Sequence, residues 1–164
     1  AIEAGALAIK KEELPIADVI GECLKIVKGE AQSLNVDMVS QLPDDLPPFF
    51  ADRQALKKIV LNLLANAIKF TPNGGRVTLK AEATKNARIL EIRDTGIGIP
   101  DSQIAIITDP FVKGAADPYT SQAGAGLGLS IVKALVKSHD GHLDIKSDIG
   151  KGTIVRITFP YPAP

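Results

Sequence analysis

The heptapeptide Asp94-Thr95-Gly96-Ile97-Gly98-Ile99-Pro100 is the most informative stretch of this chain. It follows a predicted strand, residues 88–93, in which alternation places Asp94 on the same face as Leu90 and Ile92. A carboxylate on an apolar face is costly unless it has a designated partner. The two glycines allow a sharp turn and a close approach by another group. The pattern predicts a carboxylate at the rim of a ligand pocket, although Asp-Thr-Gly is also an ordinary strand-ending turn.

The rest of the chain alternates between helical and extended patterns. Apolar residues repeat with helical spacing from Pro15 to Leu34, from Asp52 to Phe70 and from Leu127 to His139. Alternation and turn residues predict strands over residues 36–42, 77–83, 88–94, 143–147 and 153–159. The last four strands form two hairpins, which favours a layered α+β sandwich over a parallel doubly wound sheet.

Three further segments are expected between or before these elements. Residues 1–13 are predicted to be a helix end and a linker, and residues 102–107 a short helix. Residues 109–126 are irregular and rich in small residues. An irregular segment of this length is typical of a functional lid or of a disordered loop.

Size and composition exclude several classes of function. The 164 residues suit one domain with a sizeable core, and the net charge of zero gives no field for nucleic acid or a membrane surface. The single cysteine, Cys23, excludes an intrachain disulfide framework and is expected in the core. No apolar run approaches the roughly 20 residues of a membrane span. The chain begins at Ala1 and is interpreted as a piece of a longer protein.

The second helix carries a polar stripe opposite its apolar stripe. Helical spacing places Asn62, Asn66 and Lys69 together on that stripe. It could be a plain solvated face, or two amide oxygens could serve as ligands for a hard cation, with the Lys69 ammonium facing an anion. Magnesium is held by few protein oxygens together with substrate phosphates, so one or two amides suffice. Phe70 lies at the edge of the stripe, either as a core residue or as a cover for a planar base.

A glycine cluster, Gly124-Ala125-Gly126-Leu127-Gly128-Leu129, opens the third helix. Free N–H groups at a helix start bind anions, and glycine lets a phosphate approach them. The cluster is not a dinucleotide fingerprint, because its spacing differs and no strand precedes it. Residues 150–153, Gly-Lys-Gly-Thr, do not form a Walker loop either.

Four motifs, in this order, resemble the ATP-binding catalytic domain of sensor histidine kinases, which has the GHKL fold shared with gyrase and MutL. The resemblance covers nearly the whole chain. The motifs are the N box at residues 62–70, the first glycine box at residues 94–100, the F box at Asp109-Pro110-Phe111 with Lys113, and the second glycine box at residues 124–129.

The resemblance implies a role for each motif. Asp94 would accept a hydrogen bond from the adenine amino group, Asn66 with support from Asn62 would bind Mg²⁺ bridging the phosphates, and Lys69 would meet phosphate. Phe70 would flank the nucleotide, and residues 109–124 would form an ATP lid. The other residues implied in the nucleotide site are Gly96, Gly98, Ile99, Phe111, Lys113, Gly124, Gly126, Leu127, Gly128 and Leu129.

The resemblance also implies a fold and partners. The fold would be a two-layer α/β sandwich with a mixed sheet of about five strands and three main helices. Residues 1–14 would be the end of a dimerisation helix and a linker, and residues 15–164 the catalytic domain. The partners would be the dimerisation domain of the parent kinase and a response regulator. The isolated domain is expected to be a monomer, and its parent protein a homodimer. The domain is expected in the cytoplasm, whether or not the parent has a membrane anchor elsewhere.

Asn62 distinguishes a kinase from an ATPase of the same fold. GHKL ATPases place a glutamate one turn before the magnesium asparagine, as base for the attacking water, and Asn62 cannot take a proton. A kinase needs mainly positioning and charge stabilisation, so we expect ATP binding with slow hydrolysis. The only histidines, His139 and His142, are expected to be structural, which places the acceptor histidine outside this chain.

Two other classes of function are considered. A nucleotide-gated interaction module would bind ATP without phosphotransfer, and Ala125, where the family often has threonine or serine, keeps this alternative open. The second alternative is one half of an aspartic protease, because Asp94-Thr95-Gly96 matches the triad of those enzymes. Those enzymes are almost all β, whereas three helices are predicted here, and only one such triad is present.

Overall fold

The computed structural model describes residues 9–100 and 125–162, with the side chains of residues 125–128 outside that description. Five strands form a mixed sheet in the order β2-β4-β5-β7-β6, in which only the β2–β4 pair is parallel. The helices are α1 (Ile16–Ser33), α2 (Arg53–Lys69) and α5 (Ala125–Ser138). The strands are β1 (Lys11–Leu14), β2 (Asp37–Gln41), β3 (Phe49–Asp52), β4 (Arg76–Ala83), β5 (Ala87–Asp94), β6 (His142–Asp148) and β7 (Gly152–Pro160).

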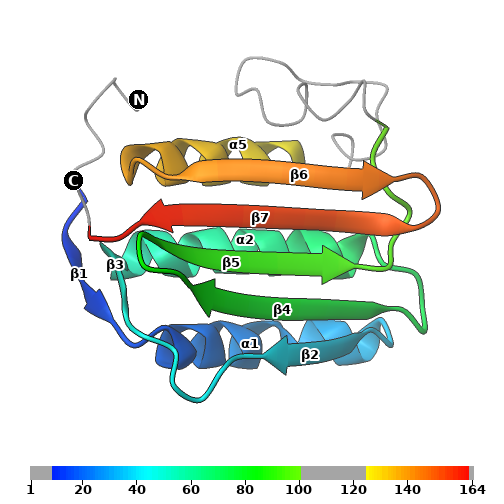
Figure 1. Ribbon diagram of the computed structural model, residues 1–164. Coiled ribbons are helices and arrows are strands. Elements are labelled where there is room, and N and C mark those ends of the chain that lie inside the picture. The colour runs from blue at the N-terminus through cyan, green and yellow to red at the C-terminus, as the bar shows by residue number, and fades with distance from the viewer. Residues whose placement is uncertain (1–8, 101–124, 163–164) are drawn as a thin grey trace.

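The three helices lie on one face of the five-stranded sheet and leave its other face open (Figure 1). Buried residues alternate along β5, so that Asp94 follows Leu90 and Ile92 on the face toward the helices. Between the two layers lies one apolar core, which includes Cys23, as expected. The predicted two-layer sandwich with a mixed five-stranded sheet and three main helices is confirmed.

Asp52 begins α2, as the sequence predicts. Its Oδ1 accepts a 2.9 Å hydrogen bond from the Ala55 N–H, which otherwise has no helical partner. The apolar stripe of α2 is buried against the sheet and the neighbouring helices. The start of the third helix was predicted at Leu127, whereas α5 begins at Ala125, because the glycine cluster extends into the helix itself.

Two strands were missing from the sequence prediction. Residues 11–14 form β1 and residues 49–52 form β3, and they pair antiparallel with each other. The assignment of residues 11–14 to a linker is therefore wrong, because Leu14 is 1% exposed and belongs to the core. Each strand has only four residues, which is too short for alternation to be recognised. The predicted helix at residues 102–107, the lid at residues 109–124 and residues 1–8 of the predicted helix end and linker lie outside the described residues.

The chain directions bring three segment ends together. The carboxyl end of β5, the carboxyl end of α2 and the amino end of α5 meet at one end of the sandwich, opposite β1 and β3 (Figure 1). Each of these ends carries one of the predicted motifs. Among the described residues, no helix has the length and apolar character needed to cross a membrane.

Candidate functional site

Asp94 is held at the end of β5 by two backbone donors. Its side chain is buried, with the residue 8% exposed, and its Oδ1 accepts hydrogen bonds from Gly96 N at 2.8 Å and Thr153 N at 3.2 Å. Its Oδ2 accepts no hydrogen bond from the described residues. The carboxylate is thus fixed by one oxygen, which leaves the other available for a ligand.

Burial raises the pKa of the Asp94 carboxyl above its ordinary value of 3.8, and the hydrogen bonds from Gly96 and Thr153 oppose this increase. Among the described residues no cationic side chain pairs with Asp94, and a buried carboxyl without such a partner is destabilising in the free protein. A ligand that donates a hydrogen bond to Oδ2 would offset part of that cost.

A small, partly open cavity of about 20 Å³ lies beside Asp94, which is room for about one water molecule. It brings together four of the predicted site residues, Asn66, Asp94, Ile99 and Leu129. These come from α2, from the end of β5, from the glycine turn and from α5. The other lining residues are Leu63, Ala67, Ile92, Thr153 and Val155.

Asn66 presents an unusual amide to this cavity. Its Nδ2 is buried and has no hydrogen-bond partner among the described residues. A buried polar group without a partner is rare and indicates a ligand or water contact. Asn62, one turn earlier, is half-buried, and Lys69 in the last turn is exposed. Neither Asn62 nor Lys69 lines the cavity.

The glycine turn supports the site through its backbone. Gly98 has φ +80°, and a Cβ there would clash with the carbonyl oxygen of Asp148 at the end of β6. The Ile97 N–H donates to the carbonyl oxygen of Phe70 at 3.3 Å, which fixes the turn to the end of α2. Phe70 is 7% exposed, and neither its ring nor Gly96 nor Gly98 lines the cavity.

Sequence reasoning missed two polar residues of the site, Ser147 and Thr153. Thr153 is buried, lines the cavity and is the polar member of a core-facing row that continues with Val155 and Ile157. A threonine on an apolar face is the same signal that singled out Asp94. Ser147 contacts Thr153 across the β6–β7 pair, a contact that requires knowledge of the strand register.

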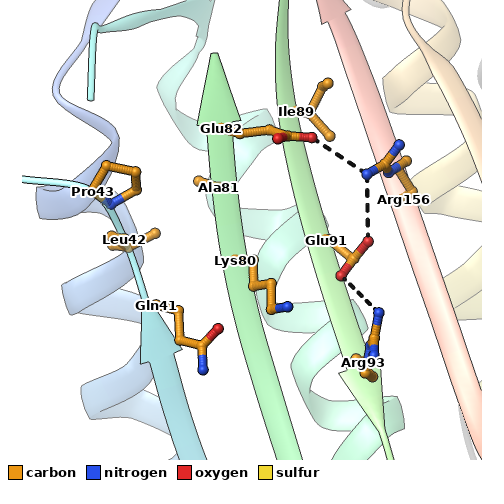
Figure 2. A pocket seen from close by; sticks show the side chains of 10 residues that line it. All are labelled: Gln41, Leu42, Pro43, Lys80, Ala81, Glu82, Ile89, Glu91, Arg93 and Arg156. Atoms are coloured by element: carbon orange, nitrogen blue, oxygen red, sulfur yellow. Dashed lines mark hydrogen bonds and ion pairs between the residues drawn. The ribbon is translucent and has the colours of Figure 1, made fainter. Parts of the chain in front are cut away.

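A larger hollow of about 680 Å³ lies on the open face of the sheet (Figure 2). Four of its five charged side chains are paired with one another: Arg156 with Glu82 at 3.3 Å and Glu91 at 3.6 Å, and Arg93 with Glu91 at 3.5 Å. The fifth is Lys80. None of the predicted site residues lines this hollow. It lies on the face opposite Asp94 and Asn66, so we do not assign the nucleotide to it.

His139 is 2% exposed, and both of its ring nitrogens contact the backbone. Nε2 accepts from Asp52 N at 3.1 Å, and Nδ1 lies 2.7 Å from the Leu135 carbonyl oxygen, to which it donates as the protonated nitrogen. Burial lowers the pKa of His139 below 6.5. These contacts agree with the expected structural role of this histidine.

Several predicted site residues cannot be placed. Phe111, Lys113 and Gly124 lie outside the described residues, and Gly126, Leu127 and Gly128 are placed only as backbone of α5. The described residues contain no cluster of three His, Cys, Asp or Glu side chains that could hold a metal ion.

Residues 51–163 match the family model described as the histidine kinase-, DNA gyrase B-, and HSP90-like ATPase. The chain belongs to this family. It is 37% identical over 163 residues to the non-motile and phage-resistance protein of Caulobacter vibrioides, and 36% identical over 162 residues to the uncharacterized sensor-like histidine kinase R01002 of Rhizobium meliloti. The aligned regions cover 97% and 99% of this chain but only 19% and 31% of those relatives.

A solved structure shares the fold. The crystal structure of full-length ShkA in complex with AMPPNP superimposes with a TM-score of 0.83 and 26% identity. The superposition covers 97% of this chain and 33% of ShkA. This chain therefore spans about a fifth to a third of the length of these three proteins.

Proposed function

We propose that this chain is the ATP-binding catalytic domain of a sensor histidine kinase, which positions Mg-ATP for transfer of the γ-phosphate to a histidine outside the chain. One observation carries the proposal: Asp94 and Asn66, from two different motifs, line the same small cavity. In each, one polar atom, Asp94 Oδ2 or Asn66 Nδ2, has no hydrogen-bond partner among the described residues. Family membership and the AMPPNP bound by ShkA support it.

The purine would be recognised at its amino edge. The cavity has room for about one water molecule, so the exocyclic amino group would be the part of the base that reaches into it. Asp94 Oδ2 would accept a hydrogen bond from that amino group. The Gly96 and Thr153 N–H groups hold the carboxylate in place for this contact before the base arrives.

The residues present fit magnesium. Asn66 and Asn62 offer amide oxygens one helical turn apart on α2. Mg²⁺ takes oxygen ligands and is commonly held by one or two protein groups together with phosphates. When bound, the ion would neutralise phosphate charge during transfer. Lys69, in the last turn of α2, would face the phosphates.

The chain offers no general base at the position used by ATPases of this fold. Asn62 stands there, and an amide cannot accept the proton of an attacking water. The site would therefore protect bound ATP from hydrolysis until an acceptor histidine arrives. The parent protein would supply that histidine on a dimerisation domain and would pass the phosphate to a response regulator, as a cytoplasmic homodimer.

The experiment that tests this function is phosphotransfer between separate domains. Labelled ATP is incubated with the chain alone and then with the folded dimerisation domain of its parent. Acid-labile label should appear only on the added domain and should vanish with Asn66→Ala. Label on His139 or His142 would contradict the proposal. ATP binding without any transfer would favour a nucleotide-gated interaction module instead.

A further inference from the structure

A single hydroxyl group, that of Ser147 on β6, contacts three partners behind the Asp94 cavity. Its Oγ accepts a 2.6 Å hydrogen bond from Ile99 N, lies 3.0 Å from the Gly152 carbonyl oxygen and lies 2.8 Å from Thr153 Oγ1. Thr153 lines the cavity, and its own N–H donates to Asp94. Ser147 therefore contacts, through one hydrogen bond, a residue that lines the cavity in which the base would be recognised.

Counting protons decides the direction of these bonds. A serine hydroxyl has one hydrogen and two lone pairs, and the Ile99 N–H uses one lone pair. If the Ser147 hydrogen pointed at Thr153 Oγ1, the Gly152 carbonyl would face a lone pair at 3.0 Å. All three contacts are satisfied only when Ser147 donates to Gly152 and accepts from the Thr153 hydroxyl.

We propose that Ser147 is a positioning residue that fixes the direction of the Thr153 hydroxyl and thereby makes the site selective for a base with an amino group. This inference rests on the proposed function of the site. With its proton committed to Ser147, Thr153 offers only lone pairs to the cavity. Together with Asp94 Oδ2, it forms an edge of hydrogen-bond acceptors.

The edge that Asp94 Oδ2 and Thr153 Oγ1 form distinguishes two purines of the same shape. The exocyclic amino group of adenine supplies two hydrogens, one for Asp94 and one for Thr153 directly or through a water. Hypoxanthine, the base of ITP, has a carbonyl oxygen at the position of that amino group. This oxygen would face the acceptor oxygens of Asp94 and Thr153 without a hydrogen between them, which costs binding free energy. Without Ser147, the Thr153 hydroxyl could rotate and donate to that oxygen.

The test compares calorimetric affinities of the 164-residue chain for Mg-ATP and Mg-ITP. Wild type should prefer ATP, and Ser147→Ala should reduce the ATP/ITP affinity ratio by about fivefold, the value of one net hydrogen bond. In a Thr153→Val background, Ser147→Ala should leave the ratio unchanged, because the oriented hydroxyl is absent. Ser147→Thr keeps a hydroxyl and should retain the wild-type ratio.

Each remaining outcome has a definite meaning. If Ser147→Ala weakens both nucleotides equally, the residue is merely structural and the inference is overturned. If Ser147→Ala does not fold, Ser147→Cys keeps the volume with a weaker hydrogen-bonding group, and an unchanged ratio there would also overturn it. Failure of wild type to bind either nucleotide would instead contradict the proposed function.

Discussion

The backbone N–H of Thr153 donates a 3.2 Å hydrogen bond to Asp94 Oδ1, which joins the beginning of β7 to the end of β5. The two residues are 59 positions apart in sequence and are paired in register. Strand pairing, rather than the glycine turn alone, therefore holds the carboxylate. The predictions below follow from the way this buried group and its neighbours are held.

Asp94→Asn should make the nucleotide-free domain more stable at pH 7.5 while weakening ATP binding. The asparagine Oδ1 can keep the bonds from Gly96 and Thr153, and the buried charge is removed. The loss of a charge-assisted hydrogen bond should reduce affinity by about 10- to 100-fold, from about 1.5–3 kcal/mol. Urea unfolding and calorimetry measure the two effects.

The stability gain of Asp94→Asn should depend on pH with a definite sign. Because the folded-state pKa of Asp94 is raised, the penalty for its charge is full above that pKa and disappears as the pH falls below the ordinary value of 3.8. The difference from wild type should therefore shrink toward pH 4. Asp148→Asn, an exposed control at the end of β6, should show neither effect. Equal stability of Asp94→Asn and wild type at pH 7.5 would contradict this.

His139 should make the wild-type fold sensitive to mild acid. Burial lowers its pKa, and the nearby Lys11 lowers it as well, while the hydrogen bond to Leu135 and the Asp52 and Asp140 carboxylates act in the other direction. A lowered pKa means that the unfolded chain binds the proton first, so the free energy of unfolding should fall as the pH decreases below about 6.5.

His139→Gln measures this contribution. Its free energy of unfolding should be lower at pH 7.5, by about 1–3 kcal/mol, because the contacts with Asp52, Leu135 and Phe159 are lost or altered. Its stability should change less than that of wild type between pH 7.5 and 5.5. His142→Gln, at the exposed start of β6, should retain the wild-type pH dependence. The same slope in His139→Gln as in wild type would refute the assignment.

Asp52→Ala should destabilise the domain by about 0.5–2 kcal/mol, because the N-cap of α2 is removed. The same carboxylate also accepts from Lys10 N at 2.8 Å through Oδ2, so the chain entering β1 should be loosened too. Asp52→Asn keeps a capping oxygen and should recover most of the loss. Asp44→Ala, in the exposed loop before β3, is the matched control. Indistinguishable urea midpoints for the Asp52→Ala and Asp44→Ala variants would argue against the cap.

Asn62→Glu should increase ATP hydrolysis by the isolated chain. A general base typically increases the reaction rate by about 100- to 10,000-fold. A glutamate introduced without the groups that normally position it should give only part of that increase. Asn62→Gln adds the same length without a base and should stay at the slow wild-type rate. Rapid hydrolysis by purified wild type would contradict the kinase assignment.

The fold was predictable wherever a pattern was long. Alternation predicted β5 and the buried face of Asp94, and helical spacing with a capping residue predicted α2 from Asp52 onward. β1 and β3 were not predicted, because a four-residue segment such as Lys-Glu-Glu-Leu is too short to show alternation. It forms a strand only by pairing with another segment. Tertiary context decides such segments.

Part of the candidate site could be predicted from local motifs. Asp94, Asn66, Ile99 and Leu129 each belong to such a motif and line one cavity, while their contacts with a nucleotide remain predictions. Ser147 and Thr153 were not identified, since their role depends on the β5–β7 and β6–β7 registers. Cross-strand hydrogen bonds between side chains are set by register, which a single sequence specifies only indirectly.

The central claim is that Asp94 and Asn66 belong to one nucleotide site. The most direct measurement is calorimetric titration of the 164-residue chain with AMPPNP in the presence of Mg²⁺. Wild type should bind saturably, Asp94→Asn and Asn66→Ala should each weaken binding by about tenfold or more, and Asn86→Ala in the exposed β4–β5 turn should bind as wild type does. Undiminished binding in both cavity variants would contradict the account.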